Sequence, residues 1–256
     1  MSVAELKSFE ASVVDHDAPV SHRLDADHLA RHRIIGFDPT NEQAPPFLVL
    51  RSQLLKHART ATMRSFAVTS VQPGNGKSHI ALNLAAVLSR LQPTILIELD
   101  LRRPTTGIRL DIDPEHPGID DVLNAEADLR SAAIRIADSQ LTVYRVRRPR
   151  MDAEQLLASP RFRDVMEEIA AINGRSIQIV DTPPAFVHDD LVLVTRCIDG
   201  ILMVVEEART SKRALQDAIS ALLPTPIVGS ILNKSISAPS QESYYEYYSG
   251  PSDAAI

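Results

Sequence analysis

The stretch FAVTSVQPGNGKSHIALNLA, residues 66–85, decides the fold. It opens with an apolar run typical of a buried strand, and from Ser78 onward its apolar side chains recur at helical spacing. Between the two lies a turn with Gly74 and Gly76, whose backbone N–H groups can wrap an anion. Lys77 can reach the β- and γ-phosphates of a nucleotide, and the Ser78 hydroxyl can ligate magnesium. The stretch therefore predicts a P-loop that binds ATP with Mg²⁺.

This P-loop departs from the strict pattern GxxxxGK[ST] at its first position, where Val71 replaces glycine. Its placement between a buried strand and a helix still favours a P-loop over a chance Gly-x-Gly-Lys-Ser turn. The helix also presents its positive N-terminus to the phosphates. The predicted nucleotide-binding residues are Pro73, Gly74, Asn75, Gly76, Lys77, Ser78 and His79.

Several other apolar runs are nearly continuous in Val, Ile and Leu. Strands without polar alternation are covered on both faces, as in a parallel sheet. With helical segments between them, the β-α-β order predicts an α/β fold, a doubly wound and mostly parallel sheet of the P-loop NTPase class. The strands are expected at 66–70, 94–99, 177–181, 200–205 and 227–232, and the helices near 47–59, 78–91, 152–171, 189–197 and 210–222.

Composition divides the 256 residues into three parts. Residues 1–46 are polar and are expected to form a flexible N-terminal arm, and residues 47–234 hold the predicted domain. Residues 235–256 contain no Lys or Arg and are expected to be a mobile tail. Four of the five tyrosines of the chain lie in this tail, at Tyr244, Tyr245, Tyr247 and Tyr248.

The overall composition excludes several classes of protein. A net charge of −6 argues against general nucleic-acid binding, which usually requires a basic surplus. No run approaches the ~20 apolar residues of a membrane span, and the N-terminus lacks the pattern of a secretory signal. The single cysteine, Cys197, cannot form an internal disulfide. A cytoplasmic location is therefore expected.

Two of the other predicted strands end in carboxylates. The run IQIV leads into Asp181, the Walker B position of a P-loop protein, which holds magnesium directly or through water. The run TILI leads into Glu98 and Asp100, whose spacing of two projects both from one face of the strand end. If this strand neighbours the P-loop strand, one carboxylate can polarise an attacking hydroxyl and the other can bind magnesium. A solvated strand end is the alternative interpretation.

Together, PGNGKS at 73–78, ELDLR at 98–102, DTPP at 181–184 and the tail SYYEYY resemble the motifs of bacterial tyrosine autokinases of capsular and exopolysaccharide biosynthesis. The resemblance covers roughly residues 45–250. It implies transfer of the ATP γ-phosphoryl group to tyrosines, often on the tail of a neighbouring subunit, here the four tail tyrosines. Lys77, Ser78, Asp100 and Asp181 match the family's phosphate and magnesium positions, and Asn233 falls where the family contacts adenine.

Two positions depart from the family. Its presumed catalytic base is Asp, and Glu98 stands here; the added methylene moves the carboxylate by about 1 Å, a misplacement that can cost roughly 10²-fold in rate. The catalytic residues implied are Lys77, Glu98 and Asp100. The helix that carries a Glu-x-x-Arg-x-x-Arg ring-assembly motif in relatives has Pro45, Leu48 and Arg51, so only the last position matches.

The resemblance also implies partners. These are a membrane-embedded chain-length regulator that recruits the chain to the inner membrane, a second copy in trans and a tyrosine phosphatase, with no nucleic acid. Two alternatives remain open at this point. Glu98 keeps an ATP-binding scaffold or pseudokinase in consideration. A partition-type positioning ATPase would carry a signature lysine where Gln72 stands.

Overall fold

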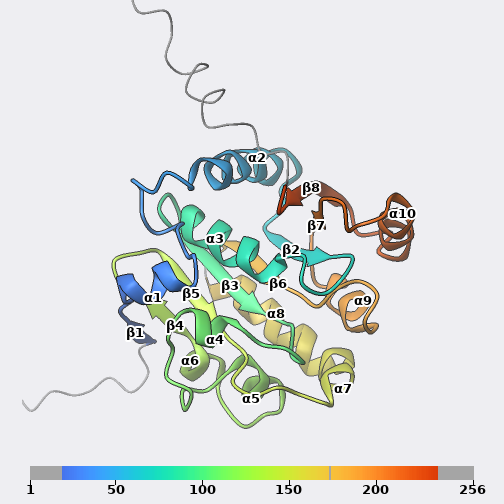
Figure 1. Cartoon of the computed structure of the whole chain (residues 1–256). Helices are drawn as coiled ribbons and strands as arrows, with labels where there is room; N and C mark the ends of the chain where they lie inside the picture. The colour runs from blue at the N-terminus through green and yellow to red at the C-terminus, as the bar shows by residue number, and fades with distance from the viewer. Residues whose placement is uncertain (1–18, 173, 236–256) are drawn as a thin grey trace, which may run out of the picture.

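The structure, a computed structural model, describes residues 19–172 and 174–235 (Figure 1). In this part of the chain the strands form an eight-stranded sheet with the order β1-β4-β5-β3-β6-β2-β7-β8. All neighbouring strands are parallel except β4 and β5. The strands are β1 Val20–His22, β2 Ser65–Ser70, β3 Thr94–Glu98, β4 Ile134–Ile136, β5 Leu141–Tyr144, β6 Ile177–Asp181, β7 Gly200–Glu206 and β8 Ile227–Asn233.

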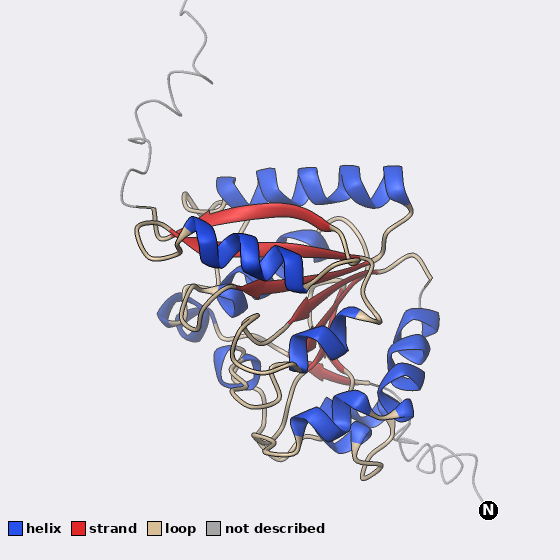
Figure 2. Cartoon of the chain, turned by 90° about the vertical axis from the view of Figure 1, so that its right-hand side faces the viewer, coloured by secondary structure: helices blue, strands red, loops and turns tan. Residues whose placement is uncertain are grey.

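Helices cover both faces of this sheet (Figures 1 and 2). One face is covered by α2 and α3, and the other by α5 and α7–α10. This two-sided cover confirms the predicted doubly wound, mostly parallel α/β fold. The helices are α1 Ala26–Arg31, α2 Pro45–Ala61, α3 Lys77–Ser89, α4 Thr106–Arg109, α5 Ile119–Leu123, α6 Leu129–Ala132, α7 Ala153–Ala158, α8 Pro160–Ile172, α9 Asp190–Thr195 and α10 Lys212–Ala221.

Side chains of the central strands alternate between two hydrophobic cores. In β2, Ala67 belongs to the core beneath α8, whereas Phe66 and Val68 belong to the core beneath α3. The same alternation occurs in β7. Successive residues of a strand point to opposite faces, so a strand between two helical layers needs apolar residues at every position. This explains the continuous apolar runs in the sequence.

The predicted strands are confirmed to within one residue at each end. The helix expected at 152–171 is instead two helices, α7 and α8, because Ser159 is extended with φ −70° and ψ 150°. A residue that precedes proline disfavours the helical region, and Pro160 follows. The strands β1, β4 and β5 were missed because three or four residues are too few for a periodic signal.

The expectation of a flexible arm over residues 1–46 is wrong from residue 19 onward. The backbone N–H groups of Ile35 and Gly36 donate to the side-chain oxygen of Asn83 in α3, at 2.7 and 3.0 Å. Ile34 is buried in the core beneath α3. Residues 19–46 therefore belong to the folded domain. Residues 1–18 of the expected arm, and residues 236–256 of the expected tail, lie outside the described residues.

We predict that Gly36→Ala destabilises the protein by about 1–3 kcal/mol, because the new methyl group overpacks this contact. A Cβ atom at Gly36 would lie 2.5 Å from the Asn83 carbonyl oxygen and 2.7 Å from the Ala86 Cβ. Thermal or urea unfolding measures the change. The control is Gly174→Ala, since a Cβ there has no atom within 4 Å. Equal stability of the two variants would contradict the packing of residues 19–46 on α3.

Candidate functional site

Three carboxyl ends of neighbouring strands meet at one edge of the sheet. The order β3-β6-β2 places β6 between the P-loop strand and the strand that ends in Glu98. The condition that β3 lies directly beside the P-loop strand β2 is therefore not met. Glu98 still lies opposite Asp181 in the register of β3 and β6, and Asp181 lies opposite Val68 of β2. The sheet thus gathers the predicted acids beside the P-loop.

The P-loop itself has the backbone conformation that its glycines permit. Gly74 and Gly76 have φ angles of 84° and 94°, in the left-handed region that other residues rarely adopt. The turn leads into α3, which begins at Lys77. A cavity of about 360 Å³ lies in front of it, between the P-loop, the segment 100–109 and the loop 183–188. Of the residues predicted to bind nucleotide or metal, the cavity is lined by Pro73, Gly74, Gly76, Lys77, Ser78, His79 and Asp100.

Lys77 is the centre of the charged groups at this site. Its ammonium nitrogen lies 2.7 Å from a carboxylate oxygen of Asp100, 3.6 Å from one of Asp181 and 3.3 Å from the Ser78 hydroxyl. Burial alone lowers the pKa of Lys77, but the carboxylates of Asp181 and Asp100 outweigh burial, and the pKa is raised. The ammonium group therefore stays charged and fixed at the mouth of the P-loop.

Asp181 is buried, and neither of its carboxylate oxygens makes a hydrogen bond of standard geometry to another described residue. Burial raises the pKa of Asp181, while Lys77 and the nearby Ser78 side chain partly offset this effect. A buried carboxylate without donors is costly, and a hard cation with its bound waters would satisfy it. The oxygen donors of Ser78, Asp100 and Asp181 therefore fit the predicted Mg²⁺.

Glu98 has a different environment from the other two acids. Like Asp181 it is buried and absent from the cavity lining, but unlike Asp181 it accepts hydrogen bonds from the N–H groups of Thr105, Thr106 and Val146, at 2.6, 2.8 and 2.9 Å. Burial and the neighbouring Asp181 raise the pKa of Glu98 to about 7. In the structure Glu98 therefore anchors the start of α4 and the end of β5. Its role as a catalytic base stays a prediction.

Residues at the ends of β7 and β8 form hydrogen bonds with the P-loop. Asn75 donates to a Glu206 carboxylate oxygen at 2.9 Å, and the Asn233 side-chain amide donates to the Asn75 carbonyl at 2.8 Å. Lys234 donates to the Gly74 carbonyl at 2.7 Å and lies 3.2 Å from Glu206. Asn75 and Asn233 thus hold the P-loop backbone in the structure, and neither lines the cavity. The contact of Asn233 with adenine stays a prediction.

Sequence reasoning missed Glu206 and Asp190. Glu206 follows an apolar strand, as Asp181 does, so the same strand-end signal pointed to it. Asp190 forms a two-bond ion pair with Arg102, at 2.7 and 3.2 Å. The sequence offers no signal for that pair, because 88 residues separate its members. It joins the segment after β3 to the start of α9 beside the cavity.

Arg51, the one residue that matches the ring-assembly motif, is half-buried in the structure. Its guanidinium donates to the Val87 carbonyl of α3 at 3.3 Å. Burial and the nearby Arg90 lower the pKa of Arg51. The side chain therefore contacts the chain's own helix, which differs from the outward contact that a ring assembly needs.

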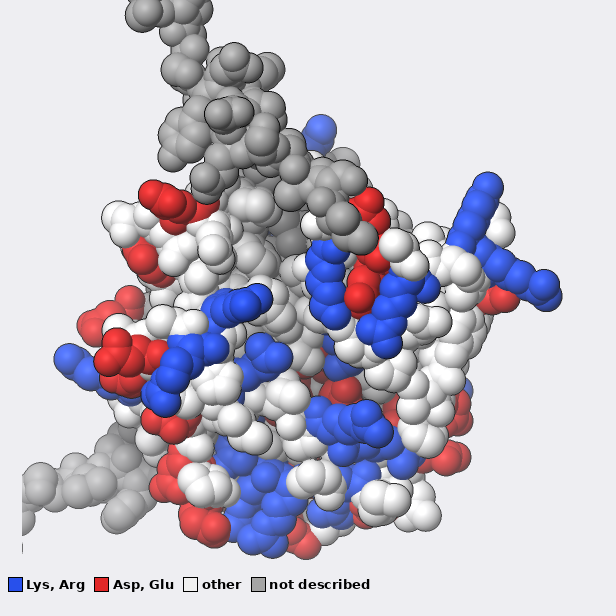
Figure 3. Space-filling model, viewed as in Figure 1, with Lys and Arg blue, Asp and Glu red and all other residues white. Residues whose placement is uncertain are grey.

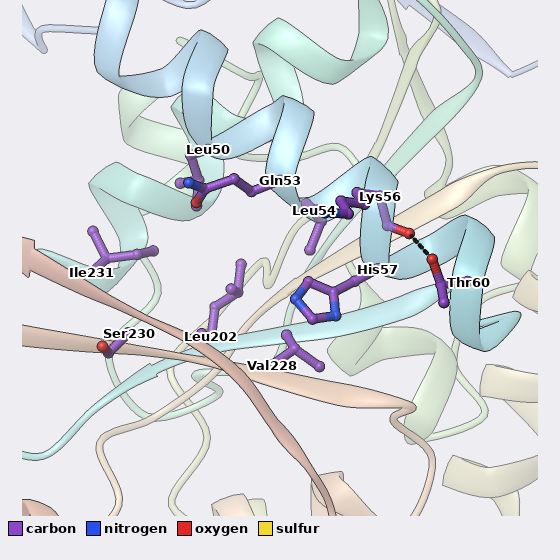
Figure 4. Close-up of a pocket in the computed structure, with 11 residues that line it drawn as sticks. Leu50, Gln53, Leu54, Lys56, His57, Thr60, Leu202, Val228, Ser230 and Ile231 are labelled. Atoms are coloured by element: carbon purple, nitrogen blue, oxygen red, sulfur yellow. Dashed lines mark hydrogen bonds between the residues drawn. The ribbon is translucent and has the colours of Figure 1, made fainter.

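A second hollow, of about 370 Å³, lies between α2 and the strands β7 and β8 (Figure 4). Leu50, Leu54 and Leu202 give it an apolar wall, and His57 points into it from α2. It has no P-loop glycine and no carboxylate among its lining residues. The groups that can hold a phosphate and a cation therefore lie at the first cavity.

The face of the described residues drawn in Figure 3 shows acidic and basic side chains interspersed. Arg102, Arg103 and Arg109 line the cavity, while Asp190 neutralises the first of them. These arginines give the cavity wall a local cationic character.

Fold and site together define a P-loop nucleotide-binding protein. No protein-family model matches the chain. It is 26% identical to the tyrosine-protein kinase YwqD of Bacillus subtilis over 221 residues, which are 85% of this chain and 92% of YwqD. It is 30% identical over 231 residues, 87% of the chain, to the succinoglycan biosynthesis transport protein ExoP of Rhizobium meliloti, but spans 28% of ExoP.

Among solved structures, the kinase domain of VpsO superposes with a TM-score of 0.70 and 25% identity, covering 82% of this chain and 98% of that domain. The similarity to YwqD and the similarity to VpsO both extend over most of the chain, P-loop and acidic strand ends included. The relatives are named tyrosine-protein kinases and the superposed structure is a kinase domain, which is consistent with a bacterial tyrosine kinase of exopolysaccharide biosynthesis.

We predict that Glu98→Gln makes stability less dependent on pH. Because the pKa of Glu98 is raised from 4.5 to about 7, the folded protein keeps a proton between about pH 5 and 7 that the unfolded chain has released. The free energy of unfolding of the wild type therefore falls as pH rises through this window, by on the order of 3 kcal/mol for this group. The variant lacks that fall.

Urea unfolding at pH 5, 6, 7 and 8 measures this dependence. The control is Glu154→Gln, which changes an exposed acid of α7. The control should keep the slope of the wild type. A Glu98→Gln slope equal to that of the wild type would show that Glu98 titrates normally in the folded protein.

Proposed function

We propose that this chain is an ATP-dependent protein-tyrosine autokinase that regulates the polymerisation or export of an exopolysaccharide. The observation that carries the proposal is Lys77, held between Asp100 and Asp181 at the mouth of a P-loop. This arrangement suits a triphosphate with a divalent cation. The similarity to proteins named as tyrosine-protein kinases supports tyrosine as the acceptor.

In the proposed reaction the phenol oxygen of a tyrosine attacks the γ-phosphorus of ATP. A new O–P bond forms while the bond from the γ-phosphorus to the β,γ-bridging oxygen breaks, and its electron pair leaves with ADP. The phenol proton passes to a carboxylate. Little covalent chemistry is left to the protein, so positioning and charge supply most of the rate enhancement.

Different residues of this chain supply the positioning and the charge. The backbone N–H groups of the P-loop hold the β-phosphate, and Lys77 neutralises charge on the β- and γ-phosphates. Mg²⁺, when bound through Ser78, Asp100 and Asp181, supplies further neutralisation of the phosphate oxygens. The loop 183–188 contributes Pro183, Pro184, Val187 and His188 to the cavity wall.

The proposed acceptors are Tyr244, Tyr245, Tyr247 and Tyr248, which lie outside the described residues. The end of the described chain supports their access to the site, because Lys234 is bonded to the Gly74 carbonyl of the P-loop. The chain from Ser235 to Tyr244 spans at most about 30 Å when extended. This reach allows the tail to enter a nearby active site, its own or that of a second copy.

A separate membrane-embedded regulator is the proposed partner. The relative ExoP, named as a transport protein, is much longer than the part that this chain matches. In the described residues no helix has both the length and the apolar character needed to cross a bilayer. Recruitment by such a regulator would place the chain at the cytoplasmic side of the inner membrane, and a tyrosine phosphatase would reverse the modification.

A second candidate function is a nucleotide-dependent scaffold of the same export system. The observation that favours it is the environment of Glu98, which holds three backbone N–H groups and would have to release some of them to reach a phenol. Such a scaffold would bind ATP without modifying tyrosine.

We predict that Lys77→Ala abolishes phosphotyrosine formation after incubation with ATP and Mg²⁺, read by mass spectrometry of the tail peptide. The reason is loss of the cation that neutralises the transferred group. Because Lys77→Ala also leaves Asp100 and Asp181 without a counter-ion, Lys77→Arg is a second variant that keeps the charge. Both should remain folded in a thermal scan.

The control is Lys56→Ala, an exposed residue of α2 far from the P-loop cavity. It should show phosphotyrosine at the level of the wild type. Phosphotyrosine in Lys77→Ala at the wild-type level would contradict the proposed mechanism. Nucleotide binding without phosphotyrosine in the wild type would establish the scaffold instead.

A further inference from the structure

The cavity in front of the P-loop is lined by more cationic side chains than acidic ones. Besides Lys77, it is lined by the guanidinium groups of Arg102, Arg103 and Arg109. Lys77 is already paired with Asp100 and Asp181. The arginines therefore decide how much positive charge remains for a ligand.

These arginines differ in what they already bind. Arg102 is committed, because Asp190 accepts two of its hydrogen bonds and the Met151 carbonyl accepts a third. Arg103 is exposed at the rim of the cavity. Arg109 is half-buried, and its guanidinium makes no hydrogen bond or ion pair with another described residue. Among the described residues of the cavity wall, Arg103 and Arg109 therefore have guanidinium groups without such partners, and Arg109 is the more buried of the two.

The charge of Arg109 acts on groups at the phosphate end of the cavity. It contributes to lowering the pKa of His79, on the first turn of α3, although burial of that imidazole is the larger cause. It also opposes the rise in the pKa of Asp181 that burial produces. In the geometry of the site, Arg109 lines the same cavity as Lys77, Ser78 and His79 at the start of the P-loop helix.

The short helix that carries Arg109 is fixed at both ends. At its start, Glu98 accepts the N–H groups of Thr105 and Thr106, at 2.6 and 2.8 Å. At its end, the His28 ring is bonded to the Ile108 carbonyl at 2.8 Å. Glu98 is thereby a positioning residue for Arg109. A side chain on such a supported element can meet a ligand with little reorganisation.

We propose that Arg109 is a further catalytic residue, whose guanidinium donates hydrogen bonds to the γ-phosphoryl oxygens of ATP and stabilises their charge during transfer. The inference rests on the proposed binding of ATP at the P-loop. Planar guanidinium groups suit bidentate bonds to phosphate oxygens, and arginines serve this purpose in other phosphoryl-transfer enzymes. The neutral Gln72 in the P-loop supplies no such charge.

The test compares the affinity of the purified full chain for a non-hydrolysable ATP analogue with its affinity for ADP, both with Mg²⁺. Arg109→Gln is expected to weaken binding of the analogue about tenfold or more, because a charged hydrogen bond to the γ-phosphate is lost, and to leave ADP within about twofold. Arg109→Lys keeps the positive charge but cannot form the two parallel hydrogen bonds of a guanidinium. Its affinity for the analogue should lie between those of the wild type and Arg109→Gln. The control Arg213→Gln, on exposed α10, should change neither affinity.

Several results would overturn the assignment. Equal weakening of ADP and the analogue would make Arg109 a general support of the P-loop, and unchanged affinity for both would remove it from the site. A rise in KM for an acidic tyrosine peptide, without an effect on nucleotide binding, would assign it to the acceptor. The comparison does not depend on transfer: a wild type that binds the analogue but forms no phosphotyrosine refutes the proposed kinase function and still decides the role of Arg109.

Discussion

The buried ion cluster of Lys77 with Asp100 and Asp181 is the constraint on which the rest of the structure depends. Removing charges from water is costly, and breaking a buried pair by deleting one partner costs roughly 3–5 kcal/mol. The cluster joins α3 to the ends of β3 and β6. The Lys77 ammonium lies 3.6 Å from Asp181, but the Asp181 oxygens accept no hydrogen bond of standard geometry from the described residues, so they can still ligate a cation beside the phosphate site.

Around this cluster, two irregular segments are held by carboxylates at strand ends. Glu206, at the end of β7, accepts from Asn75 and Lys234 and so fixes the P-loop. Glu98, at the end of β3, accepts three N–H groups and so fixes α4. Loops that bind ligands otherwise keep unpaired backbone groups, which cost free energy when buried. Glu98 satisfies three such groups directly, whereas Glu206 holds the side chains of Asn75 and Lys234, which themselves bond to backbone groups of the P-loop.

The sequence predicted those parts of the molecule whose signal is local. Continuous apolar runs revealed the strands between two helical layers, and glycine spacing located the P-loop. The parts that failed depend on distant partners. Ile35 and Gly36 were assigned to the flexible arm because their hydrogen-bond partner, Asn83, is 47 residues or more away in the sequence. The strands β1, β4 and β5 are too short for periodicity. Lys77, Asp100 and Asp181 were placed together correctly, but which side chains hold the loops could not be read from spacing.

Glu98 shows how a departure from the family pattern acquires a physical meaning. From sequence, the added methylene displaces a presumed base by about 1 Å, which weakens catalysis. In the structure the longer side chain reaches the N–H groups of Thr105, Thr106 and Val146 and is occupied there. The Glu98 carboxylate thus supports α4, which carries Arg109 to the cavity wall. Of the three strand-end acids only Asp100 lines the cavity, and Asp181 lies behind it, 3.6 Å from the Lys77 ammonium, so Glu98 acts on the cavity through the backbone that it holds.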